Sequence, residues 1–326
     1  MSVWNELSHR VLEGGTLSRD EALAVLRASE DDLLEVLAAA FAVRRRHFGR
    51  GVTLHVIRNA QSGICTEDCA YCSQSAVATS DIPRYPLQTV EDLVEGAREA
   101  ARLGAIRYCM VISARGPAEA ELDRVCEAVR RIKRERPIQL CTSLGLLTPE
   151  QAARLKAAGV DRYNHNLETA ERFYGRICGT HTYADRVATA RRAKAAGLEL
   201  CSGGLIGMGE TAEDRVDLAF ALRMLGAASI PVNFLDPRPG TRLEGLTRIR
   251  PPDALKVLAM FRLVNPDREI RIAGGREAVL GAMQVLALYP ANSMFTRGYL
   301  TTDGQGVEAD RAMVEAAGFE VTALIE

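Results

Sequence analysis

Three cysteines, Cys65, Cys69 and Cys72, lie within eight residues of the sequence, directly after an apolar, strand-like run at 52–57. Thiolates are the soft ligands that hold iron–sulfur clusters, and short spacing on a loop lets one segment wrap around one cluster. Three thiolates around four irons leave one iron free to bind a small molecule, so the spacing predicts a reactive cluster. The alternative is structural zinc, but zinc takes four ligands, and no fourth lies nearby in the sequence.

Four further candidates lie one to a predicted strand: Cys109, Cys141, Cys201 and Arg271. Each cysteine shares a strand face with a polar residue two positions earlier. Because strand side chains alternate between faces, all four could point into one barrel lumen. Matching positions on separate strands favour a second set of ligands there.

Each member of this second set also has a simpler interpretation. A free cysteine is commonly a small buried apolar residue. Arg271 could form an ion pair with Glu269 or Glu199 inside the lumen. A guanidinium has no lone pair to offer a metal, so side-chain chemistry alone does not make Arg271 a ligand.

Further polar side chains fall on the predicted inner face: Asn164 and Asn166, with Glu168 at the end of the same strand, and Asn233 on a later strand. Barrel interiors are normally filled with aliphatic layers, so a polar lumen is better explained by a ligand than by stability. The glycine-rich segment 203–210 follows the next strand. Such a segment is either a flexible loop or a place where the backbone approaches a ligand closely. By itself it is only weak evidence for a ligand site.

The remaining cysteines and histidines carry no predicted role. Cys126 lies on the apolar face of a predicted helix and is expected in the core, whereas Cys178 lies in a loop and stays unassigned. His55, His165 and His181 have no partner that the sequence identifies.

From residue 52 onward a unit repeats, consisting of a short apolar strand, a turn, an amphipathic helix and a glycine. Thr89, Thr148 and Thr211 begin helices as capping residues, and cations followed by glycine end them. Eight such units predict an α/β fold, a (β/α)8 TIM-type barrel of parallel strands. An open doubly wound sheet is the alternative, but no glycine-rich dinucleotide motif follows the first strand. The strands are expected at 52–58, 106–112, 138–144, 160–167, 198–202, 231–235, 269–273 and 291–296.

Residues 1–50 are predicted to form a helical extension that packs on the barrel domain, 51–326. Ser18 and Glu21 form a capping box, and Ser29 is expected to begin a second helix. The cations at 44–46 are interpreted as a solvated helix end.

Composition excludes several classes of function. A net charge of −1 and 5% aromatic residues give no reason to expect nucleic acid or an anionic membrane as a partner. No apolar run is long enough to span a bilayer, and the first residues lack the pattern of a signal peptide. We therefore expect a cytoplasmic protein whose eight cysteines are reduced, which favours metal binding over disulfides.

The three-cysteine motif at 65–72 resembles that of the radical S-adenosylmethionine enzymes, and the wider chain resembles the biotin synthase family. The resemblance covers nearly the whole length and rests on the segments 65–75, 107–109, 163–168, 201–210, 271–277 and 300–302. The second set, Cys109, Cys141, Cys201 and Arg271, is what distinguishes this family from the wider superfamily. Ser80 in the segment 79–82 departs from the common pattern and would affect loop geometry only.

The resemblance implies a radical-mediated insertion of sulfur into dethiobiotin to form biotin. Cys65, Cys69 and Cys72 would hold a [4Fe–4S] cluster that binds S-adenosylmethionine. Cys109, Cys141, Cys201 and Arg271 would hold a [2Fe–2S] cluster that donates sulfur. An external one-electron donor such as flavodoxin or ferredoxin and a homodimer are also implied.

The resemblance further implies roles for single residues. Tyr71 would lie near the adenine, Glu168 would accept hydrogen bonds from the ribose, and Gly207 and Gly209 would approach the same cofactor. Asn166 and Asn233 would bind the ureido ring, with Asn164 in support and Asn166 also near the cofactor. Thr301 and Thr302 would receive the substrate carboxylate.

Two alternatives remain open on the sequence. One is another radical barrel enzyme, such as a relative that matures hydrogenase. The other is an iron–sulfur protein that only carries electrons, for which the glycine-rich segment and the polar lumen would be superfluous.

Overall fold

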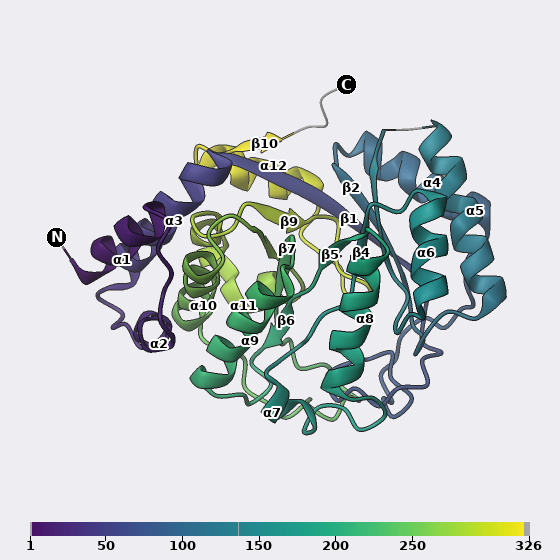
Figure 1. The fold of residues 1–326 in the computed structure, drawn as a ribbon, viewed down its shortest axis with the longest axis horizontal. Coiled ribbons are helices and arrows are strands. Elements are labelled where there is room, and N and C mark those ends of the chain that lie inside the picture. Colours follow the sequence, from purple (N-terminus) through teal and green to yellow (C-terminus); the bar gives the residue numbers. More distant parts are fainter. Residues whose placement is uncertain (1, 136, 323–326) are drawn as a thin grey trace.

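The computed structural model describes residues 2–135 and 137–322 of the chain and shows a closed barrel of parallel strands (Figure 1). Neighbouring strands pair in the order β1–β2–β3–β4–β5–β7–β8–β9, and β9 also pairs with β1, which closes the barrel. The predicted (β/α)8 fold is therefore confirmed. Its strands are β1 (Gly51–Gln61), β2 (Arg107–Ile112), β3 (Gln139–Ser143), β4 (Arg162–Asn164), β5 (Glu199–Cys201), β6 (Gly204–Ile206), β7 (Ser229–Phe234), β8 (Glu269–Ile272) and β9 (Ser293–Phe295).

The fifth barrel strand is interrupted into β5 and β6 at Ser202 and Gly203. A Cβ at Gly203 would collide with the backbone carbonyl of Pro231, so only glycine allows this approach. The interpretation of segment 203–210 as a loop is thus wrong for its first part, because β6 pairs with β7. One further strand, β10 (Glu320–Thr322), was not predicted and adds to β1 from outside the barrel.

The helices follow the predicted capping signals. Thr89, Thr148 and Thr211 each form a capping box, and Thr182 forms another at a helix that carries the same pattern. The helices are α1 (Val3–Leu12), α2 (Arg19–Leu26), α3 (Leu33–Phe48), α4 (Val90–Arg102), α5 (Glu119–Glu135), α6 (Pro149–Ala158), α7 (Glu171–Tyr174), α8 (Tyr183–Ala195), α9 (Ala212–Leu225), α10 (Pro251–Val264), α11 (Arg276–Leu280), the 3-10 helix η1 (Gly281–Leu288) and α12 (Val307–Ala316).

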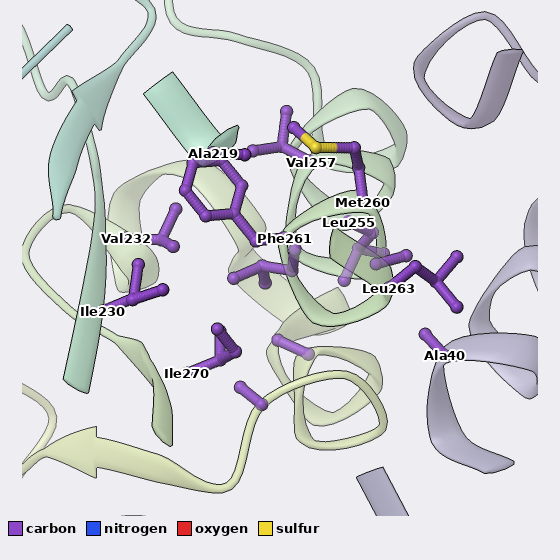
Figure 2. Packing of buried hydrophobic residues seen from close by; sticks show 14 of the residues in the cluster. Ala40, Ala219, Ile230, Val232, Leu255, Val257, Met260, Phe261, Leu263 and Ile270 are labelled. Atoms are coloured by element: carbon purple, nitrogen blue, oxygen red, sulfur yellow. The ribbon is translucent and has the colours of Figure 1, made fainter. Parts of the chain in front are cut away.

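Helix α10 is the most deeply buried helix of those described, because it lies between the barrel wall and the N-terminal helices (Figure 2). Phe261 points toward Ile230 and Val232 of β7, while Leu263 points toward Ala40 of α3. All five side chains are at most 1% exposed. Burying a leucine or phenylalanine side chain stabilises a fold by about 1.5–3 kcal/mol. The N-terminal helices therefore share one hydrophobic core with the barrel.

Two details of the N-terminal region differ from the sequence predictions. Helix α3 begins at Leu33 and not at Ser29, because Ser29 caps a preceding turn through Asp32. Arg44 is not a solvated helix end. It is fully buried and donates to the backbone carbonyls of Ala291 and Gly51, so it joins the extension to the barrel, whereas the two arginines that follow it are exposed.

In the part of the chain that the structure describes, none of the helices combines the length and the apolar character that crossing a membrane requires.

Candidate active site

A cavity of about 610 Å³ opens at the carboxyl ends of the barrel strands. This is the end at which barrel enzymes carry their active sites. The lining includes most of the predicted site residues, namely Cys65, Cys69, Tyr71, Cys72, Asn164, Asn166, Glu168, Asn233, Thr301 and Thr302.

The three-cysteine loop lies between β1 and α4 and is folded against the barrel mouth. Glu67 accepts a backbone hydrogen bond from Ala76 through its carbonyl, and Gln74 accepts one from Gly63 through its side chain. The backbone of Ala70 donates to the carbonyl of Ile177, 2.8 Å away, which ties the loop to the segment before α8. These bonds hold the three thiols at one wall of the cavity.

The three thiols have the chemistry that an iron–sulfur cluster requires. Burial raises the pKa of Cys72 to about 11 and also raises the pKa of Cys65. A hydrogen bond with Cys178, together with burial, raises the pKa of Cys69. The thiols therefore keep their protons unless a strong Lewis acid binds them, and a [4Fe–4S] cluster supplies that positive charge. The donor set fits the group that the sequence predicts.

The second set of predicted ligands meets below the cavity, inside the barrel. Cys109 and Cys141 are direct partners in the register of β2 and β3, and hydrogen bonding between them raises the pKa of Cys109 and lowers that of Cys141. Arg271 Nη1 lies 3.7 Å from Cys201 Sγ. All four residues are at most 5% exposed. The predicted convergence of three thiols and one guanidinium is therefore present.

Arg271 also forms an ion pair with Glu269, which is one of the two pairs that the sequence suggested. Its guanidinium donates to Glu269 and Ser229, whereas Glu199 pairs with Arg162 instead. Its Nε atom is buried and has no hydrogen-bond partner among the described residues. A buried donor left unpaired costs about 1–3 kcal/mol, and a cluster sulfide would satisfy it. The lumen is thus consistent with a [2Fe–2S] group.

A charged network forms the floor of the lumen. Glu269 is bound by Arg162, Arg107 and Arg271, and it also accepts hydrogen bonds from Ser229 and Ser293. Burial alone would raise the pKa of Glu269, but the surrounding arginines hold it well below its usual range. The polar residues two positions before the cysteines, which the strand pattern placed on the inner face, belong to this floor.

Glu168 marks the cavity wall at the end of the fourth strand. It adopts a left-handed backbone conformation with a φ of 69°, which is uncommon for a residue with a side chain. Its backbone pairs with β6, and its carboxylate lies 3.7 Å from Arg186. Burial raises the pKa of Glu168, with Arg186 opposing the effect. Arg186 was not identified from the sequence, although its helix begins with a capping box.

The side chains of the three predicted asparagines already form hydrogen bonds within the protein. Asn166 Oδ1 accepts from the amide of Gly203 at 3.1 Å. Asn164 Nδ2 lies 3.3 Å from Cys201 Sγ, at the boundary between cavity and lumen. Asn233 donates to the carbonyl of Gly204 and accepts from the amide of Gly274. Each amide keeps one further donor or acceptor for a ligand.

Thr301 and Thr302 lie in the loop after β9. The hydroxyls of Thr301 and Ser73 are 3.0 Å apart, which brings this loop against the three-cysteine loop. The hydroxyl of Thr302 donates to the carbonyl of Tyr299. Both threonines line the cavity as the prediction requires.

Gly207 and Gly209 are not among the residues that line the cavity. They form a turn in which Glu210 accepts hydrogen bonds from the amides of Gly207 and Met208. Gly207 has a φ of 102°, so the turn explains why glycine is found at this position. Their contact with a cofactor remains a prediction.

Cys126 lies on the buried face of α5, in the core, as predicted. Cys178 and His181, which the sequence left without roles, lie against the three-cysteine loop, and His181 also lines the cavity. Cys178 Sγ is 3.9 Å from Cys69 Sγ and 3.2 Å from His181 Nδ1. The spacing of three between a cysteine and a histidine was the signal that could have identified them. His165 lines the cavity, and its Nε2 has no partner among the described residues.

Comparisons with known proteins agree with this arrangement. Residues 61–222 match the model of the Radical SAM superfamily, and residues 231–320 match that of the Biotin and Thiamin Synthesis associated domain. The crystal structure of methylornithine synthase (PylB) covers 97% of both chains with a TM-score of 0.86 at 22% identity. The FeFe-hydrogenase maturase HydG from Carboxydothermus hydrogenoformans covers 97% of this chain and 78% of its own, with a TM-score of 0.81 at 19% identity. At such identities these two structures support the fold alone.

Sequence relatives are much closer. The chain is 55% identical to the biotin synthase of Salinibacter ruber over 98% of this chain and 89% of that protein. It is 49% identical to the biotin synthase of Bacillus subtilis (strain 168) over 100% of this chain and 97% of that protein. The chain therefore belongs to the biotin synthase family of radical SAM enzymes.

Proposed function

We propose that the chain converts dethiobiotin to biotin with two iron–sulfur clusters, one at the mouth of the barrel and one in its lumen. The observation that carries this proposal is the separation of two thiol sets by depth. Cys65, Cys69 and Cys72 line the cavity, whereas the second set lies below it and is almost fully buried. An electron carrier would have no use for the cavity between them.

Cys65, Cys69 and Cys72 would hold the [4Fe–4S] cluster, and Cys109, Cys141, Cys201 and Arg271 would hold the [2Fe–2S] cluster. When bound, the first supplies a 5′-deoxyadenosyl radical from S-adenosylmethionine and the second supplies sulfur. Three thiols would leave one iron of that cluster without a protein ligand. The walls of the barrel would limit the access of water to the radical chemistry.

The cavity side chains would serve two ligands, and Asn166 would lie near both. Glu168, Tyr71 and Asn166 line the cavity and would bind S-adenosylmethionine, and Gly207 and Gly209, which lie outside the lining, would approach the same ligand. Asn233 and Asn166 offer amide donors and acceptors that suit a ureido ring. Thr301 and Thr302 offer hydroxyls for the carboxylate, and Asn164 would support the substrate where cavity and lumen meet.

Several features of the proposal rest mainly on the family. These are a homodimer, a cytoplasmic location, flavodoxin or ferredoxin as electron donor, and the division of the chain at residue 50. Eight free cysteines support a reducing environment. A hydrogenase-maturation activity is not favoured, because the relatives of that kind share only the fold.

Anaerobic reconstitution with iron and sulfide, followed by reductant and S-adenosylmethionine, tests the proposal. We expect 5′-deoxyadenosine, and biotin when dethiobiotin is added. Absence of 5′-deoxyadenosine would overturn the radical assignment. Formation of 5′-deoxyadenosine without biotin would restrict the chain to a different radical reaction.

A further inference from the structure

Cys178 and His181 form a compact cluster of metal-binding side chains with Cys69 of the three-cysteine loop. One donor atom from each lies within 4.8 Å of the other two. The geometry points to a mononuclear site for a thiophilic divalent cation such as Zn²⁺ or Fe²⁺, used when the cluster is absent. Its competition with the cluster rests on the proposed function, because Cys69 would belong to both.

Two of the three distances are close to those of tetrahedral coordination, and the third, between Cys69 and His181, is within 4.8 Å. Zinc–sulfur bonds of about 2.3 Å and zinc–nitrogen bonds of about 2.0–2.1 Å imply edges of roughly 3.8 Å between two sulfurs and roughly 3.6 Å between sulfur and nitrogen. The two sulfurs are 3.9 Å apart, and Cys178 Sγ is 3.2 Å from His181 Nδ1. The three atoms therefore need to move little to share one ion.

The histidine ring is already oriented for this role. The hydroxyl of Tyr174 is 2.8 Å from His181 Nε2, and Arg186 donates to the same hydroxyl. A second contact of this kind is what fixes a ligating histidine, because it directs the other ring nitrogen toward the metal. His181 Nδ1 accordingly faces Cys178 and the carboxylate of Glu67.

The surrounding charges favour a cation. Glu67 Oε2 lies 2.5 Å from His181 Nδ1, where an ion would replace the shared proton, and this carboxylate or a water would complete the tetrahedron. Asp68 Oδ1 lies 3.3 Å from Cys178 Sγ and accepts from the amides of Gly179 and Thr180. Those bonds hold Cys178 in position behind Cys69. Arg115 partly offsets the negative charge at Glu67.

The site and the cluster compete for the same thiolate. Cys69, His181 and Glu67 line the cavity, whereas Cys178 does not. An ion held by Cys178, His181 and Cys69 would occupy the Cys69 sulfur that the cluster requires. Zinc bound here therefore delays cluster assembly.

Cobalt(II) titration of reduced, cluster-free, full-length protein tests the site, since thiolate-to-cobalt charge-transfer bands count the bound sulfurs. The parent variant carries Cys65→Ala, Cys72→Ala, Cys109→Ala and Cys141→Ala, which removes competing pairs of thiols. We expect one cobalt ion with two thiolates. Cys178→Ser should weaken binding by more than about 100-fold, beyond the roughly 10–100-fold that losing an outer contact costs. Cys126→Ser, which changes a buried cysteine elsewhere, should not. Equal binding in the Cys178→Ser and Cys126→Ser variants would overturn the site.

If the parent variant does not fold, His181→Gln and Cys178→Ser in a chain that carries only Cys65→Ala and Cys72→Ala should each remove one equivalent of bound cobalt. An unchanged number of equivalents would overturn the site. In a second arm, added Zn²⁺ should slow cluster reconstitution in the unchanged chain but not with Cys178→Ser. Equal slowing would overturn the competition. Failure of the reconstituted protein to form 5′-deoxyadenosine would refute the proposed function while leaving the cobalt result intact.

Discussion

Arg271 Nη1 lies 3.7 Å from Cys201 Sγ, while the same guanidinium pairs with Glu269 on the floor of the lumen. One side chain therefore links the second thiol set to the network of buried charges. This relationship explains how a guanidinium, which has no lone pair for a metal in its usual state, comes to lie among the three thiols of the lumen. The charge is held there by Glu269 whether or not a cluster is bound.

Replacing Arg271 by methionine should destabilise the protein by about 1–3 kcal/mol, because Glu269 loses one partner but keeps Arg107 and Arg162. Urea unfolding of the cluster-free protein measures the change. Arg131→Met is the matched control, since Arg131 is 37% exposed and a surface pair contributes about 0–1 kcal/mol. Equal effects of the two substitutions would contradict a structural role of the lumen charge.

Cys69→Ala should abolish 5′-deoxyadenosine formation and leave the spectroscopic signals of the second cluster. Cys178 should not rescue the cluster, because it lies outside the cavity lining despite its closeness to Cys69. Product analysis with Mössbauer spectroscopy checks both statements. Loss of both clusters together would show that the two sites are not independent.

Cys141→Ala should have the opposite pattern, in which 5′-deoxyadenosine forms but biotin does not. Cys141 is 3% exposed and lies opposite Cys109 in the strand register, below the cavity. The comparison of the two products in one assay is the measurement. Biotin formation over many turnovers by this variant would refute a ligand role for Cys141.

Glu168→Gln should raise the KM for S-adenosylmethionine with a smaller change in kcat. A hydrogen bond to a charged group contributes about 1.5–3 kcal/mol, which corresponds to roughly 10–150-fold in binding. Steady-state kinetics with S-adenosylmethionine as the varied substrate measure the effect. Glu171→Gln, which changes an exposed residue three positions away, is the control. A fall in kcat with no change in KM would contradict ribose binding by Glu168.

The arginine-held Glu269 should make the fold sensitive to acid. Burial opposes its charge, but Arg271, His55, Arg162 and Arg107 hold the pKa of Glu269 well below its usual range. A carboxyl whose pKa is lower in the folded state stabilises the fold above its unfolded pKa of about 4.3. That stabilisation is lost progressively as the pH falls from this value through the folded-state pKa.

Glu269→Gln should therefore flatten the decrease of the free energy of unfolding below about pH 4.3. Urea unfolding at a series of acid pH values measures the slope. Glu171→Gln should keep the slope of the unchanged protein. A steeper slope in the Glu269→Gln variant would show that another group controls acid stability.

The barrel and the two thiol sets could be predicted from local sequence patterns. Alternation along short strands placed Cys109, Cys141, Cys201 and Arg271 on inner faces, and capping threonines marked the helices, because both signals act within a few neighbouring residues. The short spacing of Cys65, Cys69 and Cys72 required no long-range information either.

Which side chains meet across the barrel could be seen only in the folded chain. The burial of Arg44, the strand character of 204–206 and the position of Cys178 behind Cys69 all depend on contacts between distant segments. Such contacts leave no periodicity in the sequence. Their cause is the closure of the sheet between β9 and β1, which brings the ends of all strands to one mouth and packs the later loops against the first.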